Sequence, residues 1–594
     1  MNSKVLLPLV AALLLTACGA SESTSETDHS ADLAQLFDDY FEDFLVLSPI
    51  SATANGDDRY DDQYANSIGP EHRAAVKNLH AEYLSRLELI NFDALSYQEQ
   101  LSYEMFKYAR EMSLEGLEYP GHLMPMNHYR SAMTSFVSLG SGAGLHPFKT
   151  VKNYDDFLAR VDGFVVYVDQ AIENMRAGMQ QGYVVPSAVM TQFRPQLESQ
   201  MVASAGESGF YAPITNMPDD FNDADRERLT AAYVDAIENK IVPAYQRMHH
   251  FVSDEYIGAT RDSVGQLDLP NGDEWYAYNA RLRTTTDLTP DEIHQIGLDE
   301  VARIHGEMRN VMVEVGFDGD LNEFFIYVNS DPDFFYDEPE QLIQAYRDMS
   351  AHIEDLSTKL FKHFPATGFE VRAVEAYREK TSSKGSYRAG LADGTRPGVF
   401  YANTYNVGTR PKWDMQSLYL HEAIPGHHFQ ISLQRENEEL PRFRRFGGFT
   451  AYSEGWGLYA ESLGKEIGVY TDPMDYFGAL NAELWRSIRL VVDTGIHAKG
   501  WTRQQVLDFM YANSAVSETR AVAEAERFIS WPGQALAYKI GMLKIREIRA
   551  GAEAQLGERF DVQEFHNQVL KDGAMPLSML EAKIQRWIDA TLEI

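Results

Sequence analysis

The chain has 594 residues, of which 44% are hydrophobic and 12% aromatic, so it can bury a large apolar core. Its formal net charge of −36 argues against a nucleic-acid partner, because a protein that binds phosphates presents a basic face. No internal repeat period is visible, which argues against a solenoid.

The N-terminus has the pattern of a secretory signal. Lys4 precedes an apolar run, residues 5–15, that is too short to span a bilayer as a mature helix and has the length of a signal h-region. The run ends in LTAC, which resembles a bacterial lipobox, so we expect residues 1–18 to be a lipoprotein signal peptide and Cys18 to be lipidated. The alternative is a signal peptide with an incidental cysteine.

The next segment, residues 19–30 (GASESTSETDHS), is small, polar and acidic, and we expect a flexible tether. The residue after Cys18 is Gly19 and not the aspartate associated with retention in the inner membrane. This favours an outer-membrane lipoprotein facing the periplasm. Membrane association would then depend on the N-terminal lipid. Because Cys18 is the only cysteine, a disulfide framework and a catalytic Cys/His pair are both excluded.

The rest of the chain is mostly helical in pattern. Apolar residues recur at helical spacing over residues 33–44. Thr289 and Glu292 form a capping-box pattern that predicts a helix through residue 308, and Thr502 begins a second such pattern.

Strand signals are few. The clearest are residues 369–377 (FEVRAVEAY) and 398–405 (GVFYANTY), separated by the Gly-rich segment 384–397. We therefore predict a mainly α, large two-lobed fold with a small antiparallel sheet. An N-terminal helical lobe would span residues 31–284, and a C-terminal lobe residues 285–594.

The segment with the clearest chemistry is residues 418–430, LYLHEAIPGHHFQ. Helix-forming residues precede His421 and Glu422, so both are expected on a helix. A zinc-binding helix normally carries histidines at i and i+4, with a glutamate beside the first. Here the i+4 position is Pro425, so the ordinary motif fails.

The proline is followed by Gly426, and this pair predicts a kink or bulge. If two extra residues are absorbed there, His427 returns to the ligand position. In a straight helix, His428 at i+7 would instead share the face of His421. We prefer His427 and keep His428 as the alternative ligand.

A third ligand is expected from Glu454, in the segment SEGWGLYAE (residues 453–461). Two imidazoles and one carboxylate leave a fourth zinc position open for water, which is the catalytic arrangement. Glu422 would take a proton from that water as it attacks a carbonyl polarised by the metal. The alternative is a surface carboxylate at Glu454, with histidines that only pack.

HEAIPGHHFQ and SEGWGLYAE are similar to segments of a bacterial family known as domain of unknown function number eight-eight-five, with the pattern His-Glu-x-x-Pro-Gly-His. The likeness extends to LTPDEIHQIGLDEVARIHGEM, RPGVFYANT, RLVVDTGIHAKGWT and ERFISWPGQALAYKIG, so it spans most of residues 288–549. That family resembles glutamate-liganded zinc peptidases, which include carboxypeptidase Taq and angiotensin-converting enzyme. The resemblance implies a helical fold beside the sheet, one zinc ion per chain, a peptide substrate and His427 as the ligand.

Secondary candidates lie downstream. Arg489, Asp493 and His497 follow one another at i+4 steps along one helix face, with a salt-bridged structural stripe as the alternative. Tyr538 or His497 could donate a hydrogen bond to a tetrahedral oxyanion.

Two residues are candidates for substrate binding. Arg527 lies in the family-like C-terminal block, together with Lys539, to which we assign no role. Asn403 ends the strand 399–403, which could pair with an extended peptide; the alternative is an ordinary sheet strand.

Two rival functions fit the same residues. One is a metal-dependent hydrolase of a non-peptide amide or ester, and the other is a non-catalytic lipoprotein that binds peptides. An intact Glu422 speaks against the second, because binding alone needs no base.

Overall fold

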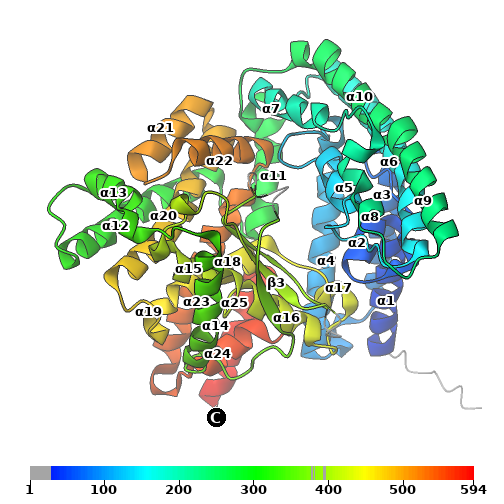
Figure 1. Cartoon of the computed structure of the whole chain (residues 1–594). Helices are drawn as coiled ribbons and strands as arrows, with labels where there is room; N and C mark the ends of the chain where they lie inside the picture. The colour runs from blue at the N-terminus through cyan, green and yellow to red at the C-terminus, as the bar shows by residue number, and fades with distance from the viewer. Residues whose placement is uncertain (1–28, 376–378, 380–381, 392–395, 594) are drawn as a thin grey trace, which may run out of the picture.

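The computed structural model describes residues 29–375, 379, 382–391 and 396–593 (Figure 1). Cys18 and the predicted signal peptide lie outside the described residues. None of the helices in these ranges combines the length and the apolar character needed to cross a membrane.

The N-terminal helices stand together on one side of the molecule, at the right in Figure 1. The predicted helix over residues 33–44 is confirmed within α1, and Pro49 begins the next helix. These helices are α1 (His29–Leu47), α2 (Pro49–Ala54), α3 (Pro70–Leu87), α4 (Tyr97–Glu118), α5 (Ala132–Gly140), α6 (Val151–Gln181), α7 (Ser187–Glu198), α8 (Ala212–Thr215), α9 (Asp223–Ala236) and α10 (Val242–Phe251).

The C-terminal part surrounds the small sheet. Both predicted capping boxes are present, Thr289 capping α12 and Thr502 capping α21. Its helices are α11 (Gly272–Thr284), α12 (Pro290–Glu314), α13 (Leu321–Ser330), α14 (Pro339–Ser357), α15 (Met415–Glu422), α16 (His427–Glu436), α17 (Arg442–Arg445), α18 (Thr450–Ser462), α19 (Gly464–Ile467), α20 (Pro473–Lys499), α21 (Arg503–Asn513), α22 (Glu518–Ser530), α23 (Ala537–Leu556), α24 (Val562–Leu570) and α25 (Leu577–Glu593).

The sheet is mixed, so the prediction of an antiparallel sheet is wrong. Its strands are β1 (Phe369–Ala373), β2 (Gly385–Arg388) and β3 (Gly398–Ala402), in the order β1-β3-β2. The two predicted strands pair in parallel, and β2, inside the segment read as a Gly-rich separator, pairs antiparallel with β3. Because β3 takes the centre, its GVFYA sequence is buried throughout, whereas the short edge strand β2 is more polar.

The two predicted lobes share apolar packing. The largest core contains side chains from both, including Phe164 of α6 and Ile488 of α20. Phe443 of α17 also packs against Phe37 of α1, with ring centroids 4.7 Å apart and ring planes at 50°. The predicted boundary at residue 285 falls between α11 and α12, and it stays a prediction.

Candidate metal centre

The HEAIPGHH segment forms two helices joined by a sharp break. Helix α15 ends at Glu422 and α16 begins at His427, with a cis Ile424–Pro425 bond between them. A Cβ atom on Gly426 would lie 2.0 Å from the carbonyl oxygen of His421, so only glycine fits there. The indole of Trp456 donates a hydrogen bond to the carbonyl of Pro425 at 2.8 Å, which ties the break to α18.

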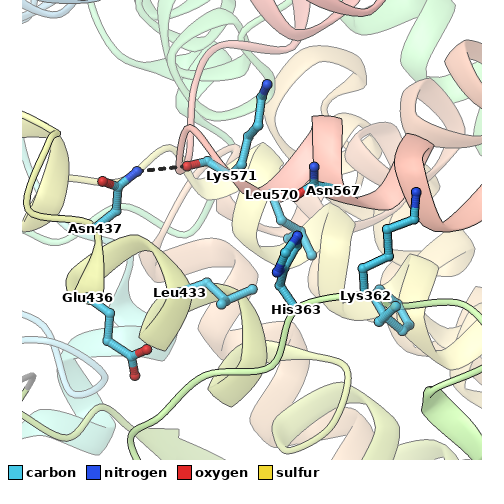
Figure 2. A pocket seen from close by; sticks show the side chains of 9 residues that line it. Lys362, His363, Leu433, Glu436, Asn437, Asn567, Leu570 and Lys571 are labelled. Atoms are coloured by element: carbon cyan, nitrogen blue, oxygen red, sulfur yellow. Dashed lines mark hydrogen bonds between the residues drawn. The ribbon is translucent and has the colours of Figure 1, made fainter.

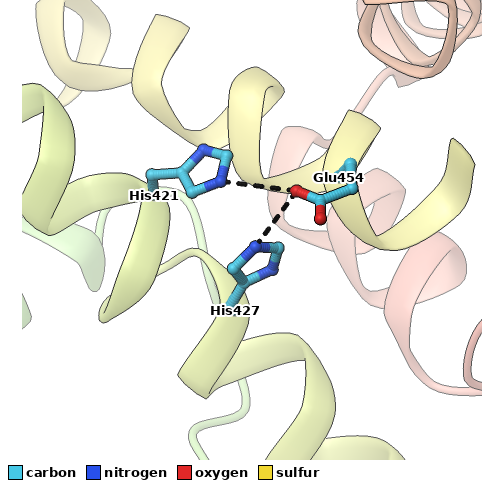
Figure 3. A group of neighbouring side chains, drawn as sticks. All are labelled: His421, His427 and Glu454. Carbon is cyan, nitrogen blue, oxygen red and sulfur yellow. Dashed lines mark ion pairs between the residues drawn. The ribbon is translucent and has the colours of Figure 1, made fainter. Parts of the chain in front are cut away.

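The break turns His427 toward His421, with ring centroids 4.6 Å apart and ring planes at 78°. Glu454 of α18 completes the cluster (Figure 3). Its Oε2 atom lies 3.6 Å from Nε2 of His421 and 3.3 Å from Nε2 of His427. One donor atom from each residue lies within 4.8 Å of the other two.

These separations fit a metal ion. Zinc binds nitrogen and carboxylate oxygen at about 2.0–2.2 Å, so the donors of a tetrahedral site lie about 3.3–3.6 Å apart. The distances from Glu454 to the two imidazoles have this length. Two imidazoles and one carboxylate are also a donor set that zinc accepts in catalytic sites. The residues therefore fit a zinc ion in both geometry and chemistry.

Glycines allow α18 to approach closely on two sides. A Cβ atom on Gly457 would lie 2.8 Å from Cε1 of His421, so this position must lack a side chain for the ring to fit. On another face, a Cβ atom on Gly455 would lie 2.5 Å from the backbone of Gly541 in α23. The pattern Glu-Gly-Trp-Gly thus reflects packing around the cluster as well as its chemistry.

A second carboxylate supports His421 from behind. Oε1 of Glu461 lies 2.7 Å from Nδ1 of His421 and 3.2 Å from Nη2 of Arg486, and Ser417 donates a hydrogen bond to Oε2. A carboxylate on the outer nitrogen of a ligating histidine fixes its ring and raises its basicity. The sequence prediction missed this role, although Glu461 follows Glu454 by seven residues on one helix and so shares its face.

Two carboxylates, Glu454 and Glu461, lie against the imidazole of His421. Burial opposes the imidazolium form, but Glu454 and Glu461 outweigh burial and raise the pKa of His421 to about 9. Burial likewise opposes the charge on Glu454, yet the two imidazoles hold its pKa well below the usual range. Each group thus favours the charged form of its neighbour, and a bound cation would meet the same attraction.

His428, the alternative ligand, lies outside this cluster. It is buried against the sheet, with Nδ1 2.9 Å from the hydroxyl of Tyr387 and its ring 4.5 Å from that of Phe369. Burial lowers its pKa to about 4. The structure therefore places His427, and not His428, with His421 and Glu454.

Glu422 directly follows His421 at the end of α15. Its side chain is largely buried, at 8% exposure. No residue in the described ranges forms a hydrogen bond or ion pair with its carboxylate. This carboxylate is therefore available to a water molecule or a substrate.

Tyr538 lies against a group of arginines, with its ring centroid 4.8 Å from Cζ of Arg489. Burial raises its pKa, and the charge of Glu454 adds to this effect. Its hydroxyl accepts hydrogen bonds from Gln534 at 3.3 Å and Arg527 at 3.5 Å. Its own proton therefore remains available for donation.

Three other candidates have structural partners. His497 is buried, with Nδ1 accepting from the amide of Gln266 at 3.0 Å and Nε2 3.0 Å from the carbonyl of Phe528, so neither nitrogen is free for an oxyanion. Asp493 accepts hydrogen bonds from Tyr276 and from the amide of residue 533. Lys539 is fully buried and pairs with two glutamates.

Asn403 organises a loop. Its amide nitrogen donates to the carbonyls of Glu379, Ser382 and Ser383, and its oxygen accepts from the amide of Tyr405. The strand that it follows is paired on both edges, so β3 cannot accept a peptide strand. The prediction of strand addition at residues 399–403 is therefore wrong.

A surface pocket of about 350 Å³ lies apart from the cluster and shares no residue with it (Figure 2). Phe361, Leu433 and Leu570 supply apolar lining. Two of its polar groups have partners: Lys362 pairs with Asp561, and Asn437 donates to a backbone carbonyl. None of the site residues predicted from the sequence lines this pocket.

Comparisons with known proteins identify relatives over most of the chain. The sequence model of a family described as "Bacterial protein of unknown function (DUF885)" matches residues 49–584. A crystal structure described as the putative lipoprotein from Colwellia psychrerythraea is 27% identical, with a TM-score of 0.88 over 95% of this chain and 99% of that chain. A putative lipoprotein of unknown function from Shewanella oneidensis is 17% identical, with a TM-score of 0.72 over 93% and 99%, and it shows the shared fold alone. No curated protein matches the sequence.

Proposed function

The chain belongs to the bacterial family of unknown function DUF885, and from that premise we propose that it is a zinc-dependent peptidase. His421, His427 and Glu454 would hold one zinc ion, and Glu422 would act as the general base. The observation that carries the proposal is the convergence of two imidazole nitrogens and one carboxylate oxygen beside a carboxylate with no partner among the described residues.

A zinc ion at this site would polarise a substrate carbonyl and lower the pKa of a water ligand. Glu422 follows a ligand directly, so on α15 its side chain points about 100° from that of His421 and lies beside the ligands. Its carboxylate accepts a proton from the attacking water and returns it to the leaving amine. Tyr538 can donate a hydrogen bond to the oxygen on which negative charge develops.

We also propose that the protein is an envelope lipoprotein, anchored through Cys18 in the outer membrane and facing the periplasm. The LTAC sequence after an apolar run supports this, and the 27% identical structural relative is described as a putative lipoprotein. In cell fractionation, Cys18→Ser should move the protein from the membrane to the soluble fraction. Unchanged membrane association would contradict the anchor.

The central test combines metal analysis with peptide hydrolysis. Glu422→Gln keeps the size of the side chain but removes its basicity, so it should retain zinc and lose hydrolysis of a peptide library by about a thousand-fold. His427→Ala should lose the zinc itself. Glu438→Gln, an exposed carboxylate nearby, is the control and should change neither.

Other outcomes would redirect the proposal. Loss of zinc in Glu422→Gln would make Glu422 a ligand, and near-full activity would remove it as the base. Zinc binding with hydrolysis of esters or non-peptide amides alone would favour the other hydrolase. Zinc binding without any hydrolysis would favour the peptide-binding lipoprotein.

A further inference from the structure

Two guanidinium groups pair with a single carboxylate on α22, and a third arginine lies one turn before that carboxylate on the same helix. Glu524 of α22 accepts a hydrogen bond from Arg489 of α20 at 2.9 Å and pairs with Arg527, one turn along its own helix, at 3.2 Å. Arg520 of α22 lies over the ring of Trp485, 4.8 Å from its centroid. The negative charge of Glu524 acts to raise the pKa of Arg520. We call Arg489, Arg520, Arg527 and Glu524 the arginine cluster.

The positive charge of this cluster exceeds its negative charge. Arg489 and Arg527 expose only 10% of their side chains, and the Nε atom of each is buried without a partner in the part of the chain that the structure describes. The nearby Asp414 is already paired with Lys384. Burial raises the pKa of Asp493 to about 7, so this neighbour carries little charge near neutral pH. A buried cation without a counter-charge is unfavourable, and an anionic ligand would correct this.

Two of the three arginines, Arg489 and Arg520, show this imbalance, whereas for Arg527 the attraction of Glu524 outweighs burial and raises the pKa. Burial lowers the pKa of Arg489, and the repulsion of Arg527 and Arg486 adds to burial despite the attraction of Glu524. Burial likewise lowers the pKa of Arg520, with repulsion from Arg489 and Arg486. The chain as a whole carries a net charge of −36, so a local excess of buried cations has the opposite sign to the net charge of the protein.

Helix α20 connects this surplus to the metal cluster. Arg486, three residues before Arg489 on this helix, pairs with Glu461 at 3.2 Å, and Glu461 lies 2.7 Å from Nδ1 of His421. Tyr538 packs against the arginines, with its ring centroid 4.8 Å from Cζ of Arg489 and its hydroxyl accepting from Arg527. The surplus therefore lies about one helical turn from the group that supports His421.

We propose that Arg489, Arg520 and Arg527 bind the C-terminal carboxylate of a peptide substrate, so that cleavage takes place near its C-terminus. Guanidinium groups bind carboxylates through paired, charge-assisted hydrogen bonds, and Glu524 holds two of these groups in place. The inference rests on the proposed peptidase function, which supplies the peptide substrate whose C-terminal carboxylate would bind here.

Peptide binding to the zinc-free protein tests the subsite without activity. Three pools of N-acetylated, sequence-randomised tetrapeptides are dialysed against chelator-treated protein: one with a free C-terminal carboxylate, one C-terminally amidated, and one amidated with aspartate or glutamate at the last position. The free-carboxylate pool should bind about ten- to a hundred-fold more tightly than either amidated pool.

Variants assign the preference to residues. Arg489→Gln and Arg520→Gln should each reduce it several-fold, and Arg489→Lys should restore part of it. The matched control is Arg228→Gln, which removes a cation from an exposed pair with Asp155 and should leave the preference unchanged. Circular dichroism checks that each variant is folded.

The outcomes distinguish a subsite for a C-terminal carboxylate from the alternatives. Equal binding of the free and amidated pools would overturn the proposal, as would a preference that survives in both arginine variants. Equal binding of the aspartate/glutamate pool and the free-carboxylate pool would assign the arginines to a side-chain carboxylate instead. Carboxylate-dependent binding to a zinc-loaded protein that hydrolyses nothing would sink the peptidase function and leave the subsite standing.

Discussion

Helix α20 passes two ion clusters of opposite character. The arginine cluster at Arg489 has three cations and one carboxylate. The other, which we call the closed network, has equal numbers of cations and carboxylates, and it includes Glu483, six residues before Arg489. The closed network consists of Arg303, Lys539, Arg546, Glu300, Glu307 and Glu483.

The difference separates a structural role from a binding role. In the closed network, Lys539 is fully buried but lies 2.7 Å from Glu300 and 2.5 Å from Glu483, so its charge is compensated within the fold. In the arginine cluster, the fold leaves positive charge unmatched beside the proposed metal site. Buried ions that are compensated contribute to the fold, whereas an uncompensated group points to a ligand.

Between the two clusters, α20 also supports the metal cluster. Arg486 lies three residues after Glu483 and three before Arg489, and it pairs with Glu461 behind His421. One helix therefore carries a structural network, a support for a metal ligand and a cationic surplus in sequence. The predictions below separate these three roles.

The largest effect should come from breaking the closed network. Lys539→Met removes a buried cation and leaves Glu483 and Glu300 short of positive charge, so the free energy of unfolding should fall by about 3–5 kcal/mol. Urea denaturation measures this change, and zinc content after mild purification should stay the same. A change below about 1 kcal/mol would show that the network contributes little to the fold.

The next effect concerns the support of the metal ligand. Glu461→Gln removes the negatively charged carboxylate beside Nδ1 of His421. Zinc affinity should therefore fall about 10- to 100-fold while the protein stays folded. Competition with a fluorescent chelator measures this affinity. Glu466→Gln, which breaks a more exposed pair with Arg549, is the matched control. Equal zinc affinity in both variants would remove Glu461 from the metal site.

Local patterns predicted the elements of this fold better than their assembly. The capping boxes at Thr289 and Thr502 depend on four consecutive residues and are confirmed. The parallel pairing of β1 and β3 arises because β2 lies between them in the chain and pairs antiparallel with the other edge of β3. The sequence GSYR is too short and too polar to be predicted as a strand. The sheet was therefore foreseen, but its mixed pairing was not.

The same division holds at the candidate site. A break at Pro425-Gly426 followed from the residues themselves, and it brings His427 beside His421. The partners of His497 lie on segments more than thirty residues away or in the other predicted lobe, so its backbone hydrogen bonds could not be read from helical spacing. Side-chain roles that depend on distant contacts needed the structure.

The smallest effect should come from Arg520, and it separates the two ion clusters most directly. Arg520→Gln loses the contact with Trp485, worth about 0.5–1 kcal/mol at a partly exposed site, but it also relieves repulsion from Arg489 and Arg486. The free energy of unfolding should therefore change by less than about 1 kcal/mol, well below the effect of Lys539→Met, although both changes remove a cation near α20. A loss comparable to that of Lys539→Met would mean that Arg520 is compensated within the fold after all, and the cationic surplus would disappear as an argument for a bound carboxylate. A near-zero change in urea denaturation, together with weaker binding of peptides with a free C-terminus, would show that this charge serves a ligand and not the fold.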